Sequence, residues 1–481
     1  MTDVHCIPWT VDEILGATGG SLVSGSKTDC FTGVSIDSRR IGPEDVFVAI
    51  RGDVHDGHRF IPDVWRIGVH GLVVDRDAVE ELDLSSRQGA APVCVAVEDT
   101  TRALGDLASR HRKRAGALVV GITGSCGKTT TKEMTASLLA GRFNTLATRG
   151  NFNNLIGLPL TLLELNRDHE AAVVELGMNR AGEIRRLTQI CRPDIGVLTN
   201  IGPVHLEGLG SIEGVMRAKG ELLEEMGPES TAILNADDPL VRRLASGCTR
   251  KIVWFGSASD AQIRATGIRA TQIGVSFVLE LPGERVRVTL NTAGTFMVSN
   301  ALAAAAVGHA LGLSAPEIRN GLEAFRPTRQ RMNMFITGND IHVIDDTYNA
   351  NPRSMEAAIH TLASLKETGR SLLVIGDMLE LGRESAALHR ELGALATRSG
   401  IERLYVTGQY AQDVAAGAVQ AGMDADRILI GSHADMIDDM VPRLQPGDWI
   451  LVKGSRSMGM EKVADGLRDR LGDVCRVPEK K

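Results

Sequence analysis

The feature that most constrains this chain is a segment rich in glycine, threonine and lysine, GITGSCGKTTT, at residues 121–131. An apolar run at residues 117–120 precedes it, and a helical pattern follows at residues 132–139. A strand, a glycine-rich loop and a helix in this order let backbone N–H groups and the helix N-terminus surround a phosphate group. Lys128 would reach the terminal phosphates of a nucleotide, and the Thr129 hydroxyl would supply an oxygen ligand for Mg²⁺.

The spacing of this loop differs from the general pattern G-x-x-x-x-G-K-[ST]. Ile122 stands six residues before Lys128, where that pattern has glycine, and Gly124 and Gly127 are only three residues apart. A plain glycine-rich turn is the alternative interpretation, but the flanking strand and helix favour phosphate binding. The candidate nucleotide-binding residues of the loop are Gly124, Ser125, Cys126, Gly127, Lys128, Thr129 and Thr130.

Length and composition limit the class of protein. The chain has 481 residues, and a prior of roughly 150 residues per domain predicts three domains. The net charge of −7 argues against a nucleic-acid partner, and the basic run at residues 110–114 is interpreted as a solvated helix end or linker. The sequence has no apolar run of about 18 residues and no signal-peptide pattern, and its seven scattered cysteines form no C-x-x-C pair. We therefore expect a cytoplasmic enzyme with reduced thiols, no zinc site and no membrane insertion.

Alternating apolar runs and helical patterns predict an α/β fold in three units, at residues 1–98, 99–326 and 327–481. Short apolar runs indicate the strands of the first unit, at residues 46–50, 71–74 and 93–97.

In the central unit, continuous apolar runs at residues 171–176 and 194–200 are typical of strands buried in a parallel sheet. The alternating pattern at residues 251–290 indicates antiparallel strands, and residues 301–313 form a strong helical pattern. The third unit repeats strand–helix alternation with HVIDD, SLLVIGD, RLYVTG and WILVKG. Each of these strands ends in a polar or glycine-containing loop, which is where doubly wound sheets bind ligands.

Two polar residues follow neighbouring strands of the central unit. Glu175 follows the apolar run at residues 171–174, where a P-loop enzyme keeps a carboxylate for Mg²⁺, and His205 follows the next strand. Each is an ordinary loop residue in the alternative interpretation, but two candidates beside a phosphate loop favour a functional role. Lys219, in the helical pattern MRAKGELLEE, is by itself typical of a solvated charge.

The order of motifs resembles that of the Mur ligases, the ATP-dependent amide-forming enzymes of peptidoglycan assembly. These motifs are GxTGSxGKTT, NFNN followed by GLPLTLL at residues 151–163, VELGM, TNIGPVH and AKGELL. The resemblance covers essentially the whole chain.

Three further segments resemble the family members that add D-alanyl-D-alanine: DDTYNANPRSMEAAI at residues 345–359, VIGDMLELG at 374–382 and VKGSR at 452–456. The ligase of the preceding step has a histidine-containing version of the first segment, and folylpolyglutamate synthetases have a DGAHNP version. Asn351-Pro352-Arg353 is similar to the diaminopimelate-recognising DNPR motif of the preceding ligase, but it lies inside the YNANP segment, so we give it no such role.

The resemblance implies a three-domain Mur ligase architecture. The N-terminal domain would bind the UDP-muramoyl peptide, a central P-loop ATPase domain would bind ATP, and a Rossmann-like C-terminal domain would bind the incoming dipeptide. Two Mg²⁺ ions are implied, with Thr129, Glu175, His205 and a carbamylated Lys219 as ligands. A carbamate suits this role because it offers anionic oxygen, whereas an ammonium repels Mg²⁺. The implied catalytic residues are Lys128, Lys219, His205 and Arg331.

The resemblance also implies contacts to the substrates. Asn300 and Asp346 would address the adenosine, and Arg331 the γ-phosphate across a domain interface. SIDSRRIGPEDVFVAIRG with HDGHRF is similar to the uridine-nucleotide-binding part of these ligases, although a polar turn at residues 37–39 is the alternative. Arg39 could bind a pyrophosphate there. The implied substrate-binding residues are Ser38, Arg39, His58, Asn153, Asn154, Tyr348, Asn349, Asn351, Lys453, Ser455 and Arg456.

One segment departs from the family pattern. Family members often have G-x-H-N-x-x-N before the helix at residue 301, whereas residues 294–300 read GTFMVSN and lack the histidine and the first asparagine. Phe296 keeps an aromatic face for stacking but not the hydrogen bond. ATP use is still implied, but the adenine contacts differ.

The implied reaction joins D-alanyl-D-alanine to UDP-N-acetylmuramoyl-tripeptide through an acyl phosphate formed from ATP. We expect a monomer without a nucleic-acid partner. The alternatives are another Mur-type or folylpolyglutamate-type amide ligase and, outside this class, a P-loop ATPase that acts as a switch or assembly factor. A Rossmann dehydrogenase is disfavoured because no G-x-G-x-x-G follows an early strand.

Overall fold

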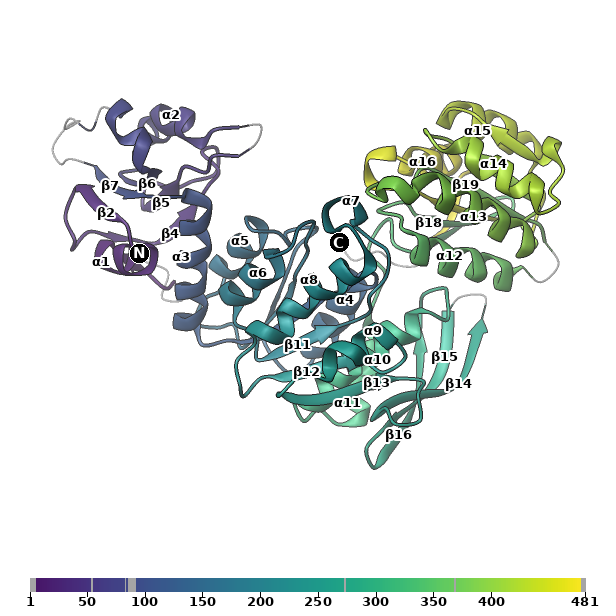
Figure 1. The fold of residues 1–481 in the computed structure, drawn as a ribbon, viewed down its shortest axis with the longest axis horizontal. Coiled ribbons are helices and arrows are strands. Elements are labelled where there is room, and N and C mark those ends of the chain that lie inside the picture. Colours follow the sequence, from purple (N-terminus) through teal and green to yellow (C-terminus); the bar gives the residue numbers. More distant parts are fainter. Residues whose placement is uncertain are drawn as a thin grey trace.

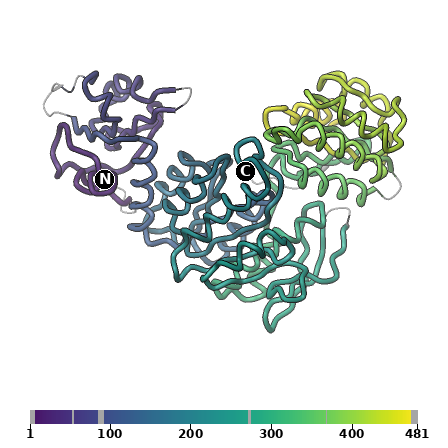
Figure 2. Tube along the Cα trace, in the orientation of Figure 1, coloured from purple at the N-terminus to yellow at the C-terminus, as the bar shows by residue number. Residues whose placement is uncertain are grey.

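The chain folds into three α/β domains, shown in Figure 1. The structure is a computed structural model that describes residues 6–52, 55–82, 84, 92–271, 274–366 and 369–476. In Figure 2 the backbone passes from a purple N-terminal domain through a teal central domain to a green and yellow C-terminal domain. The predicted three-domain α/β architecture is confirmed, whereas the domain boundaries at residues 98 and 326 stay a prediction.

The N-terminal domain has a five-stranded sheet in the order β2-β7-β6-β5-β4, which is parallel except for β2. The central strands β6 and β7 are buried along their whole length. The strands predicted at residues 46–50, 71–74 and 93–97 are β5, β6 and β7. The elements of this domain are β1 (Trp9–Thr10), α1 (Val11–Thr18), β2 (Ser21–Ser24), β3 (Cys30–Phe31), β4 (Gly33–Ser35), β5 (Asp45–Val48), α2 (Ile61–Arg66), β6 (Gly71–Asp75) and β7 (Val93–Val97).

The central domain has a nine-stranded sheet in the order β16-β15-β14-β13-β12-β11-β8-β10-β9. Its strands are β8 (Leu118–Thr123), β9 (Thr145–Ala147), β10 (Ala171–Glu175), β11 (Ile195–Leu198), β12 (Thr231–Asn235), β13 (Lys251–Gly256), β14 (Ile263–Thr271), β15 (Gly274–Leu281) and β16 (Glu284–Leu290). Its helices are α3 (Thr100–Ala115), α4 (Lys128–Leu139), α5 (Gly157–Leu163), α6 (Glu183–Cys191), α7 (Leu206–Leu209), α8 (Ile212–Glu225), α9 (Pro239–Ala245), α10 (Met297–Ala310) and α11 (Ala315–Ala324).

The pairing of the central strands matches the sequence pattern. β8 to β13 are parallel, and the apolar runs predicted as buried strands, β10 and β11, flank β8 on its two sides. The antiparallel pattern predicted at residues 251–290 applies to β14, β15 and β16, whereas β13 belongs to the parallel part. The carboxyl ends of β8, β10 and β11 therefore meet at one edge of the sheet, which is where a doubly wound sheet binds its ligand.

The C-terminal domain has a seven-stranded sheet in the order β21-β20-β19-β22-β18-β17-β23. β18 to β22 are parallel, and β17 pairs antiparallel with both β18 and β23. Its strands are β17 (Asn333–Thr337), β18 (His342–Asp346), β19 (Ser371–Ile375), β20 (Arg403–Val406), β21 (Ile428–Ile430), β22 (Trp449–Lys453) and β23 (Asp473–Arg476). Its helices are α12 (Pro352–Leu365), α13 (Ser385–Arg398), α14 (Ala411–Gln420), α15 (His433–Met440) and α16 (Glu461–Leu471).

Two predicted helices begin earlier than their apolar pattern suggests. The helix predicted at residues 132–139 is α4, which begins at Lys128 because Gly127 adopts a left-handed conformation directly before it. The helix predicted at residues 301–313 is α10, which begins four residues before the alanine-rich stretch. The earlier start of α4 gives the glycine-rich loop a helix N-terminus at its end.

The basic run at residues 110–114 ends α3, as predicted, but its side chains are not simply solvated. His111 is buried, Arg112 forms an ion pair with Asp194 at 2.6 Å, and the Arg114 guanidinium lies over the ring of Trp9. The solvated interpretation is correct for the exposed Arg110 and Lys113 but wrong for the other three residues, because α3 packs against α1 and against α5 and α6. In the part of the chain that the structure describes, no helix has the length and apolar character needed to cross a membrane.

Candidate active site

A cavity of about 640 Å³, here called the interdomain cavity, is lined by residues of the central and C-terminal domains. The predicted site residues that line it are Ser125, Cys126, Gly127, Lys128, Thr129, Thr130, Asn153, Glu175, His205, Asn300, Arg331, Asp346, Tyr348, Asn349, Asn351, Lys453, Ser455 and Arg456. Of the described residues, the predicted ones that do not line it are Gly124, Asn154, Lys219, Ser38, Arg39 and His58.

Two glycines shape the phosphate loop, which we define as residues 124–130. Gly124 and Gly127 have φ angles of 150° and 81°, which side-chain-bearing residues rarely adopt. A Cβ atom on Gly124 would lie 1.9 Å from Thr199 Oγ1, and one on Gly127 would lie 2.2 Å from Asn300 Oδ1. The shortened loop therefore needs glycine at both positions.

Donors of the phosphate loop are bonded to protein oxygens in this structure. The Cys126 N–H donates to Asn200 Oδ1 at 2.9 Å, and Lys128 Nζ donates back to the Gly124 carbonyl at 2.9 Å. These are strong donors beside the N-terminus of α4, where an anion is stabilised. The loop thus has the composition of a phosphate site, with its donors held by internal acceptors.

Glu175 lies at the centre of a buried polar cluster. Its side chain is buried, and its two carboxylate oxygens accept from Thr129 Oγ1 at 2.7 Å and from Asn153 Nδ2 at 2.8 Å. The Glu175 N–H also donates to Thr148 Oγ1 at 3.1 Å. Two chain segments, the start of α4 and the loop after β9, therefore hold Glu175 directly beside the phosphate loop.

Lys219 is buried in α8, with an exposed fraction of 2%. Burial, followed by the nearby Lys128 ammonium, lowers the pKa of Lys219 well below its usual value. In the described part of the chain its ammonium forms no ion pair. The interpretation of an isolated solvated charge is therefore wrong for this lysine.

His205 contacts the C-terminal domain through Glu380. Its Nδ1 is hydrogen-bonded to a carboxylate oxygen of Glu380, and the Glu207 N–H donates to the Glu380 carbonyl at 3.3 Å. The hydrogen bond from His205 lowers the pKa of Glu380. His205 and Glu380 both have positive φ angles, 52° and 61°, which are uncommon outside glycine and asparagine. The motif at residues 374–382 contained Glu380, but nothing local in the sequence indicated its partner.

The C-terminal side of the cavity has a buried ion pair. Lys453 Nζ donates to Asp346 Oδ2 at 2.5 Å and to the Asn349 carbonyl at 2.9 Å. Beside it, the Arg331 guanidinium lies 4.0 Å from the centre of the Tyr348 ring, a cation–π contact. The strand-end motifs DDTYN and VKGS are therefore brought together by pairing of β18 with β22.

The Asp346–Lys453 ion pair should stabilise the C-terminal domain. Asp346→Ala removes the carboxylate partner of Lys453, whose side chain is only 3% exposed. We expect the local stability of the C-terminal domain to fall by about 3 kcal/mol, because a buried ammonium loses its counter-charge. Hydrogen exchange of the β18 and β22 amides measures this stability.

The matched control for Asp346→Ala is Asp413→Ala, which removes the acidic partner of the exposed Arg390 in the same domain. Its cost should stay below about 1 kcal/mol, because solvent screens an exposed pair. Equal protection losses in the two variants would contradict a special role for the Asp346–Lys453 pair.

Three family models match the chain in sequence order. "Mur ligase family, catalytic domain" matches residues 31–112, "Mur ligase middle domain" residues 122–308, and "Mur ligase, glutamate ligase domain" residues 330–456. The UDP-N-acetylmuramoyl-tripeptide–D-alanyl-D-alanine ligase of Escherichia coli (strain K12) is 36% identical over 96% of this chain and 98% of its own length. The chain belongs to the Mur ligase family. The enzyme of the same name from Bacillus subtilis (strain 168) is 34% identical over 95% of this chain and 98% of its own.

Solved structures agree with this Mur ligase fold. A crystal structure of MurF from Acinetobacter baumannii is similar with a TM-score of 0.87 and 33% identity, covering 97% of this chain and all of the other. MurF ligase from Thermotoga maritima, solved in complex with ADP, has a TM-score of 0.80 and 28% identity, with 91% and 97% of the two chains covered. The three-domain Mur ligase architecture is therefore shown for this chain.

The segment that departs from the Mur ligase pattern lines the interdomain cavity. Phe296 and Met297 lie on its wall, in place of the histidine and asparagine of the family motif. Asn300 is buried, and its Oδ1 accepts from Thr131 Oγ1 at 3.3 Å, against the phosphate loop. The predicted aromatic face at position 296 is therefore retained beside the cavity.

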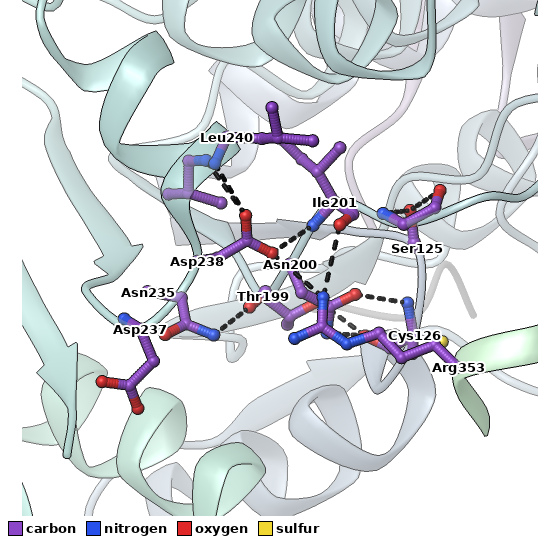
Figure 3. A network of polar contacts seen from close by, with 12 residues as sticks. Ser125, Cys126, Thr199, Asn200, Ile201, Asn235, Asp237, Asp238, Leu240 and Arg353 are labelled. Carbon is purple, nitrogen blue, oxygen red and sulfur yellow. Dashed lines mark hydrogen bonds and ion pairs between the residues drawn. The ribbon is translucent and has the colours of Figure 1, made fainter. Parts of the chain in front are cut away.

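A network of polar contacts connects the phosphate loop to the segment after β11, to Asp238 and to Arg353 of α12 (Figure 3). Ser125 Oγ donates to the Gly202 carbonyl at 3.1 Å and accepts from the Gly202 N–H at 2.9 Å. The buried carboxylate of Asp238 accepts from the Ile201 N–H at 2.9 Å and from Arg353 of α12 at 3.0 Å. Sequence reasoning found neither Asp238 nor a role for Arg353.

The predicted substrate residues of the N-terminal domain lie outside the interdomain cavity. Arg39 is exposed and bonded to Asp37, which lowers the pKa of Asp37 to about 2. His58 is nearly buried, with Nδ1 bonded to Asp56 at 2.7 Å and Nε2 accepting from the Asp75 N–H at 3.0 Å. The polar turn left open at residues 37–39 is present, and the exposed guanidinium of Arg39 faces solvent.

Proposed function

We propose that this Mur ligase joins D-alanyl-D-alanine to UDP-N-acetylmuramoyl-tripeptide with consumption of ATP. The observation that carries the proposal is the meeting of the phosphate loop and Glu175 with the segment of Tyr348, Asn349 and Asn351 in one cavity. The two relatives described above, which match 95% and 96% of the chain, have the name of this activity. The MurF ligase of Thermotoga maritima, solved with ADP, supports adenine nucleotide binding.

The reaction has two chemical steps. The γ-phosphoryl group of ATP passes to the terminal carboxylate of the tripeptide, which gives an acyl phosphate and leaves ADP. The amine of the dipeptide then attacks the acyl carbon, an amide bond forms, and phosphate and a proton are released. Such steps depend on positioning and charge neutralisation rather than on a protein nucleophile.

Two cations of the chain would neutralise the transferring phosphoryl group. Lys128 would leave the Gly124 carbonyl and bind the terminal phosphates, and Arg331 would approach the γ-phosphate from the C-terminal domain. Both lie on the wall of the cavity, on opposite domains. Closing of the domains around the acyl phosphate would exclude water from it.

The residues beside the phosphate loop fit Mg²⁺ in part. The Thr129 hydroxyl and the Glu175 carboxylate, 2.7 Å apart, are the hard oxygen donors that this ion prefers. The described residues contain no group of three or more His, Cys, Asp or Glu side chains arranged for a metal. A carbamate on Lys219 would add an anionic ligand, and His205 a nitrogen ligand after leaving Glu380. When bound, Mg²⁺ supplies charge neutralisation at the phosphoryl group.

The remaining site residues would bind substrates. Asn300 and Asp346 would address the adenosine, although Asp346 is also the partner of Lys453. The dipeptide pocket would be formed by Tyr348, Asn349, Asn351, Lys453, Ser455 and Arg456. Asn153 and Asn154 would lie near the phosphates or the muramyl tripeptide, and Ser38, Arg39 and His58 would bind its uridine diphosphate. A monomeric state and a cytoplasmic location stay predictions.

The test of this function measures phosphate release with ATP and UDP-N-acetylmuramoyl-tripeptide, with and without D-alanyl-D-alanine. Sustained release should require all three, and the product should gain the dipeptide by mass spectrometry. Release that does not depend on the tripeptide would indicate an ATPase switch instead. Release with the tripeptide and single amino acids, but not with the dipeptide, would indicate another ligase step.

A further inference from the structure

Arg353 connects the C-terminal domain to the central domain at the edge of the interdomain cavity. Its Nη1 donates to Asp238 Oδ2 at 3.0 Å and to the Ile201 carbonyl at 3.3 Å (Figure 3). The side chain of Asp238 is 3% exposed, whereas that of Arg353 is 44% exposed. Because one partner is buried, solvent screens this ion pair less than a pair between two surface residues.

Asp238 is tied to the phosphate loop through the segment after β11. The Ile201 N–H donates to Asp238 Oδ2 at 2.9 Å. The residue before Ile201, Asn200, accepts the Cys126 N–H at 2.9 Å and donates its Nδ2 to the Cys126 carbonyl at 3.0 Å. The Arg353 guanidinium is therefore connected to the backbone of the phosphate loop through Ile201 and the adjacent Asn200.

The same end of α12 has a second contact with the phosphate loop. Asn351, the N-cap of α12, accepts from Cys126 Sγ at 3.1 Å. Arg353 and Asn351 together hold the N-terminal turn of α12 against the central domain. Tyr348 and Asn349, which line the cavity, lie on the loop that leads directly into this turn.

Two features indicate that Arg353 serves the domain contact rather than its own helix. A cation in the first turn is unfavourable to a helix, because the N-terminal end of the helix dipole is positive. Without Arg353, the Asp238 carboxylate would still accept hydrogen bonds from three backbone N–H groups, those of Ile201, Leu240 and Val241. Loss of Arg353 would therefore leave the fold of each domain intact.

We propose that Arg353 is a positioning residue, which aligns the acceptor segment at residues 348–351 with the phosphate loop. This inference rests on the proposed function, in which the dipeptide amine must reach an acyl phosphate formed at that loop. An error of about 1 Å in such an alignment can reduce a rate roughly 100-fold. In the proposed function the triphosphate is bound chiefly by Lys128 and Thr129 of the central domain, so loss of Arg353 should affect ATP binding less than it affects the ligation step.

The experiment compares the full-length wild type with Arg353→Met and Arg353→Lys. Methionine keeps most of the side-chain length without charge, and lysine keeps one charged donor without the planar fork. The matched control is Arg390→Met, which breaks an exposed ion pair with Asp413 inside the C-terminal domain. The readouts are kcat and KM for ATP and for the dipeptide, the ratio of amide formed to ADP released, and small-angle X-ray scattering of the free protein.

Arg353→Met should lower kcat at least roughly tenfold, with a smaller change in the KM for ATP, because Arg331 and Asp346 are the only proposed ATP contacts of the C-terminal domain among the residues assigned above. The amide-to-ADP ratio should fall, because water competes for a poorly aligned acyl phosphate. Arg353→Lys should recover part of kcat, and Arg390→Met should match the wild type. In an Asp238→Asn background, Arg353→Met should have little further effect.

Scattering separates this inference from the proposed function. Arg353→Met should broaden the distribution of intramolecular distances relative to the wild type and Arg390→Met, whatever the substrate is. An unchanged distribution together with unchanged kcat would overturn the positioning role. A wild type that makes no amide bond would overturn the proposed function, and the scattering result would still decide whether Arg353 aligns the domains.

Discussion

Lys219→Ala is expected to reduce ligation by about 10²–10³-fold while ATP still binds. The expectation follows from the environment of this lysine inside α8. Its exposed fraction is 2%, and its pKa is lowered first by burial and then by the Lys128 ammonium. A lowered pKa raises the fraction of the neutral amine, whose free electron pair can add to carbon dioxide.

The product of that addition is a carbamate. The Nζ–C bond forms, one proton leaves the nitrogen, and a neutral side chain becomes an anion. The Lys128 ammonium attracts an anion at position 219, whereas it would repel an ammonium there. The carbamate oxygens would be hard ligands of the kind Mg²⁺ prefers. Alanine removes this group entirely, so the loss should appear in kcat and in the Mg²⁺ requirement.

Rescue of Lys219→Ala activity by short carboxylic acids tests whether a carboxylate is the missing group. Formate or acetate should restore part of the Lys219→Ala activity by occupying the space of the missing carbamate, and should not stimulate the wild type. The control is Lys251→Ala, which removes an exposed lysine at the start of β13 in the same domain. Full activity of Lys219→Ala at saturating Mg²⁺ would show that the carbamate is not needed.

The parts of the site that the sequence predicted are those with contiguous motifs. The phosphate loop, Thr129 and Glu175 could be located because a strand, a loop and a helix follow one another without interruption. Parallel strands end at the same edge of a sheet, so Glu175 at the end of β10 had to lie near the loop after β8. The hydrogen bond from Thr129 to Glu175 is the physical outcome of that register.

The parts that the sequence did not predict are contacts between distant segments. His205 and Glu380 are 175 residues apart, and Asp238 and Arg353 are 115 apart, so no local pattern pairs them. The same limit applies to His111, whose basic neighbours suggested solvent. Its burial depends on α3 packing between two domains, and a helical pattern alone does not show which side of a helix is covered.

Glu175→Gln is expected to lower kcat by about 10²–10³-fold with a raised Mg²⁺ requirement. The substitution keeps the size of the side chain but removes its charge and replaces one acceptor by a donor. In the wild type both oxygens accept, one from Thr129 and one from Asn153. A glutamine NH₂ group would face one of these donors, and a buried donor without an acceptor is costly.

Asp346→Ala and Glu224→Gln are the two variants with which the Mg²⁺ dependence of Glu175→Gln is compared. Asp346 lies on the opposite wall and holds Lys453, so its loss should act through the stability of the C-terminal domain and the KM for ATP. Glu224 is an exposed acid paired with Arg185, and its amide variant should behave as the wild type. Titration of activity with Mg²⁺ separates the three, because only Glu175→Gln should shift the midpoint. The same midpoint for Glu175→Gln and the wild type would show that Glu175 is not a metal ligand, since loss of a ligand's charge weakens the binding of Mg²⁺.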